Sequence, residues 1–531
     1  MGNILRFCLI IFFRAAALWS QEVPKQFQNP ILKGFNPDPS VCRVGDDYYL
    51  ATSSFGWFPG MPVYHSKDLV NWELIGHGLT RPSQLNLNGI KDEKGIWAVT
   101  IRYHEGLFYL ITTCSDCGGN FYITAKDPAG EWSDPVWLKD APGIDPSLFW
   151  DEDGTCYYTG NTWDFKKDWP SQCAVWAQKL DLKQQKLVGE RKNLTYGYAN
   201  NAAYAEGPHL YKIDKNYLLL MSEGGSSLNH AISAHHGNTV LGNFTADKVN
   251  PVLSHRQLGE DYPWQTIGHG DLVQLPNGDW WSVVLGTRNI KNQVKLTRET
   301  FLCKVKFENG TPIFNPGFGK VLTEQERPNL PWTPVKQEAE RDEFDAAELS
   351  LKWHTVRTPN KEFYHVSKGK LSLNLLPTTA DSLMHSSMLI QRIKDTRYTA
   401  TAKLSFQTNK INEQAGLILH RTNNSYYMLL KEKSRIVLIK KFAQKKEEIA
   451  SFPYDKTEVF LSVDADDLNL QFSFGASPDT MTKIGGIQDL VVLAEGNGNK
   501  FNGPGIGMYA TGNGKKSSNK AVFDRFEYKA E

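Results

Sequence analysis

The sequence predicts an all-β protein, built as a five-bladed β-propeller followed by a β-sandwich. Three observations support this: a degenerate repeat in the first 320 residues, a lack of long segments with the helical 3.6-residue period, and polar–apolar alternation in the last third. A chain of 531 residues is long enough for two to four ordinary domains. An irregular β-sandwich with coincidental hairpins is the alternative for the first part.

The repeat consists of a Gly, Asp or Asn turn signal that leads into paired aromatic and aliphatic residues. Five segments share this pattern and follow one another at intervals of roughly 50 to 60 residues. Units of this length, with several short strands separated by Gly, Pro, Asn and Asp turns, are typical of propeller blades. The aromatic residues that mark the common register are Tyr48, Phe108, Tyr157, Tyr217 and Trp280.

A polar or large residue precedes each register mark by about eleven positions. Equivalent positions in propeller blades lie at equivalent radii, and the first strand of each blade lines the central axis. We therefore expect these side chains to converge on one funnel. They are Asp38, Trp97, Asp145, Glu206 and His269.

Three carboxyl groups in one pocket repel one another and lose hydration, so at least one of them should have a raised pKa. A carboxylic acid beside a carboxylate is the equipment of glycoside hydrolysis, in which one group protonates the leaving oxygen and the other activates water or attacks carbon. Prolines near Asp38, Asp145 and Glu206 restrict the backbone there. Each acid alone is more typical of a turn cap, and only the shared register favours catalysis.

Other candidate ligands lie in the same part of the chain. The indole rings of Trp97 and Trp57 suit the apolar faces of a sugar, although both could be core residues. Arg288 follows an apolar run and a Gly-Thr step, where it could pair with an acid, bind sugar hydroxyls or be a solvated loop residue. His269 could be a core histidine, an axial metal ligand or a neighbour that tunes a pKa.

Charge and targeting signals exclude several classes of function. The 59 Lys and Arg residues balance the 58 Asp and Glu residues, so no global field attracts nucleic acid or an anionic membrane. Residues 1–20 combine Arg6, a short apolar run and small residues up to Ser20, which predicts a cleaved signal peptide. No stretch is long enough for a membrane span, so we expect a secreted or periplasmic protein.

Six of the seven cysteines follow the predicted signal peptide. Cys114 and Cys117 have CxxC spacing, but no second pair completes a zinc site and no helix follows them. We interpret them as packed residues or a disulfide rather than a metal or redox site.

A change in composition marks a second domain. Prolines punctuate residues 328–341, which predicts a stiff connector between a propeller at 21–327 and a sandwich at 342–531. Tryptophan nearly vanishes after this connector, and the later strands alternate as expected for half-exposed antiparallel sheets. Acids at strand ends of this domain are either surface residues or oxygen ligands of a structural calcium ion; they are Glu343, Asp345 and Asp524.

With these residues in hand, the sequence resembles glycoside hydrolase family 43, in particular its β-xylosidases and α-L-arabinofuranosidases with a five-bladed propeller and a concanavalin-like C-terminal sandwich. The matching stretches occur in the family's order over nearly the whole propeller. They are Gly34–Ser40, Ser54–Gly60, His65–Trp72, Gly95–Ala98, Gly143–Ser147, Ala205–Pro208, Gly268–Asp271 and Arg298–Leu302.

The resemblance implies roles for the three acids. Asp38 is expected to be the general base, Glu206 the general acid, and Asp145 the carboxylate that raises the pKa of the acid and orients it. Family 43 enzymes invert the anomeric centre, which requires room for a water molecule between base and sugar.

The resemblance also assigns the other candidates. The aromatic residues Phe55, Trp57 and Trp97 are expected to bind substrate. Arg288 is expected to be the active-site arginine, and His269 to lie near a central metal ion, usually calcium.

The expected activity is exo-acting, inverting release of terminal xylose from xylan-type oligosaccharides of the plant cell wall, without an organic cofactor. Release of α-L-arabinofuranose, alone or together with xylose, is the alternative within the family. A non-catalytic carbohydrate-binding propeller is the alternative of another class.

Overall fold

The computed structural model describes residues 23–199, 201–496, 498 and 500–531, so the predicted signal peptide lies outside the described residues. The regular secondary structure of the described residues is almost entirely β-strand, with a single short 3₁₀ helix, η1 (Leu490–Leu493). No helix in this part of the chain is long and apolar enough to cross a membrane.

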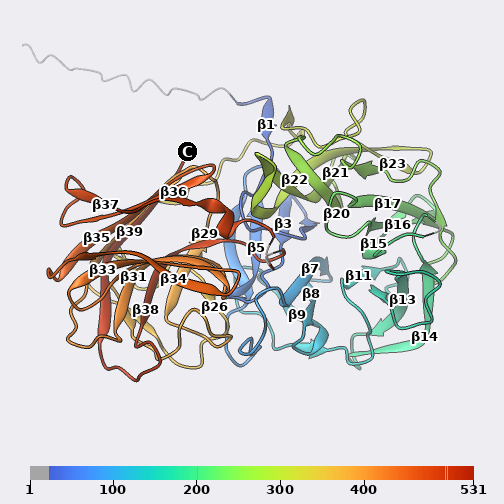
Figure 1. Cartoon of the computed structure of the whole chain (residues 1–531). Helices are drawn as coiled ribbons and strands as arrows, with labels where there is room; N and C mark the ends of the chain where they lie inside the picture. Colours follow the sequence, from blue (N-terminus) through green and yellow to red (C-terminus); the bar gives the residue numbers. More distant parts are fainter. Residues whose placement is uncertain (1–22, 200, 497, 499) are drawn as a thin grey trace, which may run out of the picture.

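The first part of the chain is a β-propeller of antiparallel sheets that follow one another in chain order (Figure 1). The first two sheets consist of β2 (Ser40–Val44), β3 (Asp47–Ala51), β5 (Gly60–Ser66) and β6 (Glu73–Leu79), then β7 (Gly95–His104), β8 (Leu107–Ser115), β9 (Gly119–Ala125) and β10 (Val136–Trp137). The third consists of β11 (Ser147–Trp150), β12 (Cys156–Thr162), β13 (Ala174–Asp181) and β14 (Lys186–Thr195).

The remaining sheets of this part continue the same meander. The fourth consists of β15 (Glu206–Ile213), β16 (Asn216–Glu223), β17 (Ala231–Gly237), β18 (Thr245–Ala246) and β19 (Leu253–Ser254). The fifth consists of β20 (Trp264–Gln274), β21 (Trp280–Ile290), β22 (Gln293–Glu308) and β23 (Thr311–Phe314).

The aromatic register marks of the sequence repeat all lie on the second strand of a sheet, namely β3, β8, β12, β16 and β21. Their rings fill the apolar layers between neighbouring sheets; the ring of Phe108, for example, meets Tyr49 of the preceding sheet at 4.7 Å. The repeat therefore reflects packing, because each sheet buries its face only against the next one.

A buried polar network joins the first strands of these sheets. The Asp271 carboxylate of β20 accepts hydrogen bonds from Ser40 Oγ of β2 at 2.6 Å and from Arg102 Nη1 of β7 at 2.7 Å. Arg102 also donates to Nδ1 of His209 on β15, and Ser147 Oγ of β11 lies 3.1 Å from the same nitrogen. Burial would raise the pKa of Asp271, but Arg102 overcomes this and lowers it, so the pair is ionised. The network fixes the strands that carry the expected site residues.

The N-terminal segment closes the propeller. Strand β1 (Gln26–Gln28) pairs with β24 (Glu324–Glu326), and Leu32 forms a bridge with Thr300 of β22. The Asn29 side-chain amide donates to the carbonyl oxygens of Leu302 and Leu322.

The last third of the chain is a sandwich of two antiparallel sheets. One consists of β25 (Arg341–Asp342), β27 (Tyr364–Val366), β28 (Leu371–Asn374), β30 (Tyr398–Ser405), β35 (Glu458–Asp466), β36 (Asn469–Gly475), β37 (Met481–Asp489) and β39 (Lys520–Ala530). The other consists of β29 (Met388–Arg392), β31 (Gln414–Thr422), β32 (Ser425–Lys431), β33 (Arg435–Phe442), β34 (Lys445–Pro453) and β38 (Gly505–Thr511). The core residues between them, such as Leu404, Leu417 and Phe472, are fully buried.

The sandwich lies beside the propeller (Figure 1), and strand pairing and a buried ion pair dock the two domains on each other. Strand β4 (Trp57–Phe58) pairs with β26 (Thr355–Val356) of the C-terminal part. Asp92 Oδ1, shortly before β7, lies 2.8 Å from Nη2 of Arg357, and both side chains are 3% exposed. These contacts hold the second domain against the propeller.

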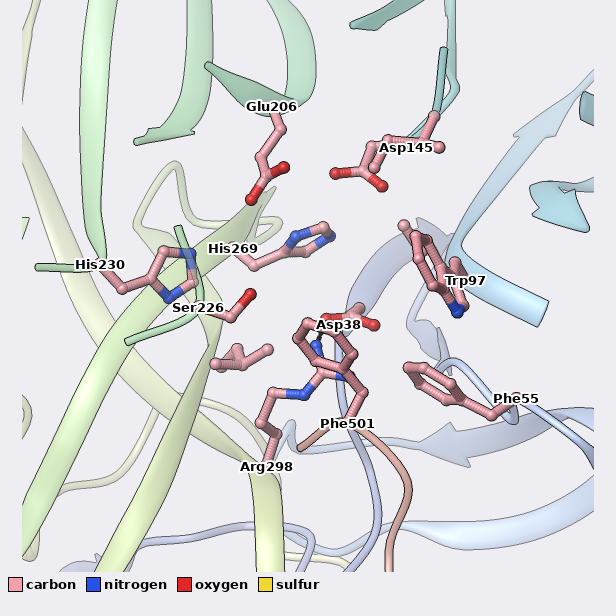
Figure 2. A pocket seen from close by; sticks show the side chains of 13 residues that line it. Asp38, Phe55, Trp97, Asp145, Glu206, Ser226, His230, His269, Arg298 and Phe501 are labelled. Atoms are coloured by element: carbon pink, nitrogen blue, oxygen red, sulfur yellow. Dashed lines mark hydrogen bonds and ion pairs between the residues drawn. The ribbon is translucent and has the colours of Figure 1, made fainter. Parts of the chain in front are cut away.

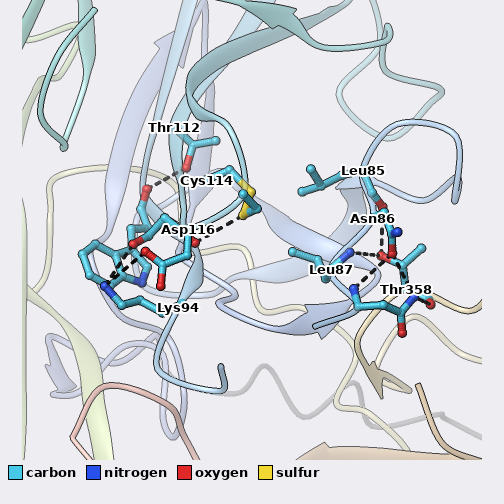
Figure 3. Close-up of a disulfide and its surroundings, with 12 residues drawn as sticks. Leu85, Asn86, Leu87, Lys94, Thr112, Cys114, Asp116 and Thr358 are labelled. Atoms are coloured by element: carbon cyan, nitrogen blue, oxygen red, sulfur yellow. Dashed lines mark hydrogen bonds and ion pairs between the residues drawn. A yellow bond between two sulfur atoms is a disulfide. The ribbon is translucent and has the colours of Figure 1, made fainter. Parts of the chain in front are cut away.

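The cysteines of the described chain are structural. Cys114, on β8, and Cys117, in the turn that leads to β9, form a disulfide, one of the two interpretations drawn from the sequence (Figure 3). Thr112, two residues before this disulfide, donates a hydrogen bond to the Trp97 carbonyl oxygen at 2.6 Å. The free thiols of Cys42, Cys156, Cys173 and Cys303 are buried.

Candidate active site

A cavity at the propeller axis collects residues from all of its sheets and from one loop of the sandwich (Figure 2). The expected residues Asp38, Phe55, Trp97, Asp145, Glu206 and His269 all line it. Seven further residues line it that the sequence analysis did not select as site residues: the apolar Ala98, Ile144 and Leu285, and Ser226, His230, Arg298 and Phe501.

The backbone at this cavity adopts conformations that L-residues seldom take. Asp38 has a φ of 53° and Asp145 a φ of 57°, and Phe55, Ala98 and His269 also lie in the left-handed region. Each such residue costs about 1–3 kcal/mol, and such strain is typical of functional sites. Here it turns the two aspartates toward the axis immediately before β2 and β11.

Asp38 is held as a carboxylate. Arg298 Nη1 donates to Oδ1 at 2.6 Å, and Ser53 Oγ donates to Oδ2 at 2.6 Å. Burial would raise the pKa of Asp38, but the Arg298 charge and the Ser53 hydrogen bond outweigh burial and lower it below the ordinary value. The group is therefore available as a base.

Glu206 has the opposite environment. It opens β15, and burial together with the negative charges of Asp145 and Asp38 raises its pKa well above the ordinary value. Burial also raises the pKa of Asp145 to about 6. Asp145 Oδ2 accepts a hydrogen bond from the backbone N–H of Gly207 at 3.1 Å, which ties it to the residue after Glu206. A protonated carboxyl group and a carboxylate thus share one cavity.

Aromatic rings form one wall of the cavity. Phe55 lies 6.2 Å from Trp97 and is stacked on Phe501 at 6.3 Å, measured between ring centroids. The Arg298 guanidinium lies 5.2 Å from the Phe501 ring centre. Since Phe501 belongs to the sandwich, the second domain completes the site. Such a wall suits the apolar faces of a sugar ring.

The histidines of the cavity do not form a metal site. His230 Nδ1 lies 2.9 Å from the Thr266 carbonyl oxygen, so it carries the proton and leaves Nε2 as an acceptor. Burial lowers the pKa of His230 to about 4, which keeps the ring neutral. Within the described residues, no group of three or more His, Cys, Asp and Glu side chains is arranged to hold a metal. The calcium ion expected near His269 is therefore not confirmed.

At the strand ends of the sandwich, the contacts of Asp524 favour the alternative of surface acids over a calcium site. Both carboxylate oxygens of Asp524 are engaged by cations, with Lys370 Nζ at 3.0 Å and Lys403 Nζ at 2.5 Å. Two ammonium groups at this position oppose the binding of a divalent cation.

Trp57 is a correction to the sequence prediction. Its side chain is fully buried in the core between the domains, where its ring lies 5.3 Å from Phe35 and 5.4 Å from His354. It does not line the cavity. The reason is strand pairing, because β4 forms hydrogen bonds with β26 and its residues serve the interface.

Arg288 is the second correction. Its guanidinium binds Glu299 through Nε at 3.0 Å and Nη2 at 2.8 Å, and Asp395 of the sandwich through Nη1 at 3.1 Å. In the β21–β22 hairpin Thr287 pairs with Arg298, and cross-strand partners share a face. Arg288, one residue away, therefore points to the other face, and Arg298 lines the cavity instead.

The four polar or aromatic residues that the sequence analysis missed differ in how far the sequence could have identified them. Arg298 opens one of the stretches that carried the family resemblance, so the correct arginine was present in the matched motif. Ser226 and His230 lie outside every matched stretch, in the segment between β16 and β17. Phe501 reaches the cavity only because the domains dock, which no local pattern encodes.

An ionised carboxylate and a protonated carboxyl group that face one cavity, beside aromatic rings, are the functional groups of a glycoside hydrolase. The family model described as glycosyl hydrolases family 43 matches residues 27–312, and the model described as β-xylosidase C-terminal concanavalin A-like domain matches residues 341–529. The chain belongs to glycoside hydrolase family 43.

Individual relatives agree with this assignment. The chain is 39% identical to a xylosidase/arabinosidase of Butyrivibrio fibrisolvens over 513 residues, which are 94% of this chain and 98% of the relative. It is 37% identical to a non-reducing-end α-L-arabinofuranosidase of Bacteroides ovatus over 547 residues, covering 100% and 99% of the two chains. A solved xylan β-1,4-xylosidase from Bacillus halodurans superposes with a TM-score of 0.89 at 32% identity, covering 95% of this chain and 100% of that one.

Proposed function

We propose that this enzyme is an exo-acting β-xylosidase that removes terminal xylose from xylan-type oligosaccharides of the plant cell wall with inversion of the anomeric centre. The observation that carries the proposal is the contrast between two acids of one cavity: Asp38 is bound by the Arg298 guanidinium, whereas Glu206 is buried beside other carboxyl groups. A base that is ionised and an acid that is protonated at the same pH are what a single displacement requires.

In the proposed reaction, Asp38 takes a proton from a water molecule as the water oxygen attacks C1 of the terminal sugar. Glu206 donates its proton to the glycosidic oxygen as the C1–O bond breaks, so the aglycone leaves as an alcohol. Asp145 keeps a negative charge near Glu206 and so favours its protonated form. Two carboxyl groups and water complete this chemistry, so no organic cofactor is needed.

Substrate binding is assigned to the cavity walls. Within the described residues, Nε and Nη2 of Arg298 are buried beside the cavity and have no hydrogen-bond partner, so a sugar hydroxyl group that reached them would satisfy them. His230 Nε2 offers an acceptor, and Phe55, Trp97 and Phe501 offer an apolar wall. The wall contributed by the sandwich closes one side of the cavity, which supports attack on a terminal rather than an internal sugar.

The second candidate within the family is release of α-L-arabinofuranose. It is favoured by the names of two relatives, a xylosidase/arabinosidase and an α-L-arabinofuranosidase. Xylose and arabinofuranose place similar groups around C1, so one cavity can accept both. We favour xylose because the C-terminal domain matches a domain described from β-xylosidases.

The test compares kcat/KM on 4-nitrophenyl β-D-xylopyranoside and 4-nitrophenyl α-L-arabinofuranoside, followed by product analysis on xylobiose, arabinoxylan and arabinan. The proposal expects the xyloside to be preferred, with α-xylose as the first anomer seen by NMR. Preference for the arabinofuranoside would favour the second candidate, and retained configuration would reject the assigned mechanism. Binding of xylo-oligosaccharides without turnover would instead indicate a carbohydrate-binding propeller.

We also propose that the protein is exported to the periplasm or the medium, because residues 1–20 have the composition of a signal peptide. Cell fractionation of the full-length chain, with N-terminal sequencing of the mature protein, tests this. Activity that stays in the cytoplasm with Met1 intact would reject it.

A further inference from the structure

The disulfide between Cys114 and Cys117 lies on the strand next to one wall of the cavity. Strand β8, which carries Cys114, pairs with β7 so that Thr113 is opposite Trp97 and Cys114 is opposite Ile96. Trp97 lines the cavity. The chemistry described so far uses neither the CxxC motif nor its disulfide, although both are attached to the strand that carries this ring.

The backbone and the ring of Trp97 are held in different ways. Its carbonyl oxygen accepts a hydrogen bond from Thr112 Oγ1 at 2.6 Å, and the N–H of the next residue, Ala98, donates to Ser53 Oγ at 2.7 Å. Within the described residues, Trp97 Nε1 is buried and has no hydrogen-bond partner. The orientation of the indole therefore depends on what the ring itself contacts.

Lys94 makes such a contact. Its Nζ lies 4.8 Å from the centre of the Trp97 ring, and Lys94 is not among the residues that line the cavity. An ammonium group is attracted by the negatively charged face of an indole. The Lys94 side chain is 33% exposed, and at such sites the attraction changes an equilibrium roughly two- to fivefold.

The position of this ammonium group is set by the two residues between the cysteines. Lys94 Nζ lies 3.4 Å from Ser115 Oγ and 3.7 Å from Asp116 Oδ1. Figure 3 shows Lys94 and Asp116 directed toward each other beside the disulfide. A partly exposed ion pair alone holds a long side chain weakly. The position of Lys94 therefore depends on how rigidly the turn presents these two oxygen atoms.

The turn is closed by two links. The Cys117 N–H donates to the Cys114 carbonyl oxygen at 3.2 Å, and the two sulfur atoms are bonded to each other. Between them, Asp116 has a φ of 63°, in the left-handed region that Asp tolerates better than most residues. One hydrogen bond contributes little net free energy, so the covalent link is what keeps the turn closed.

We propose that the disulfide turn and Lys94 form a clamp that positions the Trp97 ring against the terminal sugar. Lys94 is a positioning residue in this clamp, and the disulfide acts through it. The inference rests on the proposed function and adds to it the origin of one wall of the sugar site. The CxxC motif thereby has a role that needs neither a metal nor a redox cycle, because the bond stays closed during turnover.

The test removes each part of the clamp separately. Lys94→Met keeps the aliphatic stem and loses the charge, Lys94→Arg keeps a cation, and Cys114→Ala/Cys117→Ala lacks the cross-link. In the wild type, dithiothreitol opens the bond. One of its thiolates attacks a sulfur atom of the disulfide, its second thiol closes the ring of the oxidised reductant, and the two thiol protons end on Cys114 and Cys117.

Two controls accompany these forms. Lys212→Met is the matched variant, because Lys212 Nζ lies 5.3 Å from the ring of Tyr217 and 3.4 Å from Asp151 Oδ1, and none of these three residues lines the cavity. The reductant should not change the kinetics of Cys114→Ala/Cys117→Ala, because the other cysteines of the described chain are free thiols.

The substrate is whichever of the two 4-nitrophenyl pentosides the wild type turns over faster. We expect Lys94→Met, the reduced wild type and Cys114→Ala/Cys117→Ala to raise its KM about two- to fivefold, with kcat within twofold of the wild type. Lys94→Arg and Lys212→Met should match the wild type. Adding Lys94→Met to the double alanine variant should raise KM no further, because both changes release the same ring.

An unchanged KM in Lys94→Met or in the reduced wild type would overturn the clamp, and so would a lower melting temperature with unchanged KM, which is the result of a disulfide that only stabilises the fold. If the double alanine variant does not fold, these two forms decide, because both keep the cysteines. A wild type that turns over neither pentoside would reject the proposed function. The clamp would then be judged by the Kd for xylobiose from calorimetry, with the same criteria, and absence of binding would overturn it as well.

Discussion

Arg298 Nη1 lies 2.6 Å from Asp38 Oδ1, while Nε and Nη2 of the same guanidinium have no hydrogen-bond partner within the described chain. One side chain therefore performs two tasks. It keeps the proposed base ionised in a buried place, and it holds two unpaired donors beside the cavity. Because unsatisfied buried donors are costly, binding of a hydroxyl-rich ligand relieves a cost that the free enzyme carries.

The first prediction concerns the proposed base. Asp38→Asn keeps the size of the side chain but cannot accept a proton from water. We expect kcat to fall by about 10²–10⁴ on xylosides, with little change in KM. Ser53→Ala, which removes only one hydrogen bond to the carboxylate, should have a much smaller effect. Steady-state kinetics on both variants, with circular dichroism to confirm folding, would contradict the assignment if Asp38→Asn kept a tenth of the activity.

The second prediction concerns pH. In the proposed mechanism Asp38 is ionised and Glu206 protonated, so kcat/KM should fall as pH drops through the lowered pKa of Asp38 and as pH rises through the raised pKa of Glu206. Asp145→Asn removes a negative charge that raises the pKa of Glu206. Its alkaline limb should therefore move to lower pH, while the acidic limb stays in place. An alkaline limb that does not move would show that Asp145 acts in another way.

Much of the site could be predicted because its residues occupy the same position in successive sheets of the propeller. Asp38, Asp145 and Glu206 occupy equivalent positions before or at the first strand of successive sheets, so the spacing of the buried aromatic residues locates them. Trp57 and Phe501 could not be placed this way. One is drawn into the domain interface by strand pairing and the other reaches the cavity through docking, and both depend on contacts between distant segments.

The sequence analysis predicted Arg288 instead of Arg298 as the active-site arginine for a different reason. The two residues lie on adjacent strands of one hairpin and point to opposite faces, so a difference of one position in pairing decides which of them meets Asp38. The sequence contains both arginines in family-like contexts, but pairing register is a property of the folded sheet.

The third prediction separates these two arginines. Arg298→Met should lower kcat/KM roughly 100-fold and raise the pKa of Asp38, which shifts the acidic limb to higher pH. Arg288→Met should leave the pH profile unchanged but lower the free energy of unfolding by about 3–5 kcal/mol, because Glu299 is then buried without its partner. Adding Glu299→Met to Arg288→Met should recover part of that loss. Chemical denaturation and kinetics on the same preparations measure both effects, and a shifted pH profile in Arg288→Met would count against the structural role.

The last prediction concerns how the sandwich wall is held. Glu93, in the segment before β7, accepts hydrogen bonds through Oε2 from the backbone N–H groups of Phe501 and Asn502, the latter at 3.3 Å. This carboxylate of the propeller thereby fixes the loop of the second domain that carries Phe501, and the Phe501 ring closes the cavity. Glu93→Ala should release that loop and raise KM for xylobiose about tenfold, with a smaller change in kcat.

The matched variants for Glu93 follow from the same geometry. Glu93→Gln keeps an acceptor oxygen at the same place and should behave nearly as the wild type. Phe501→Ala should raise KM as Glu93→Ala does, and the double variant should be no worse than Phe501→Ala alone, because both changes remove the same wall. Additive effects in this double-mutant cycle would mean that Glu93 acts on the substrate by another route than the position of Phe501.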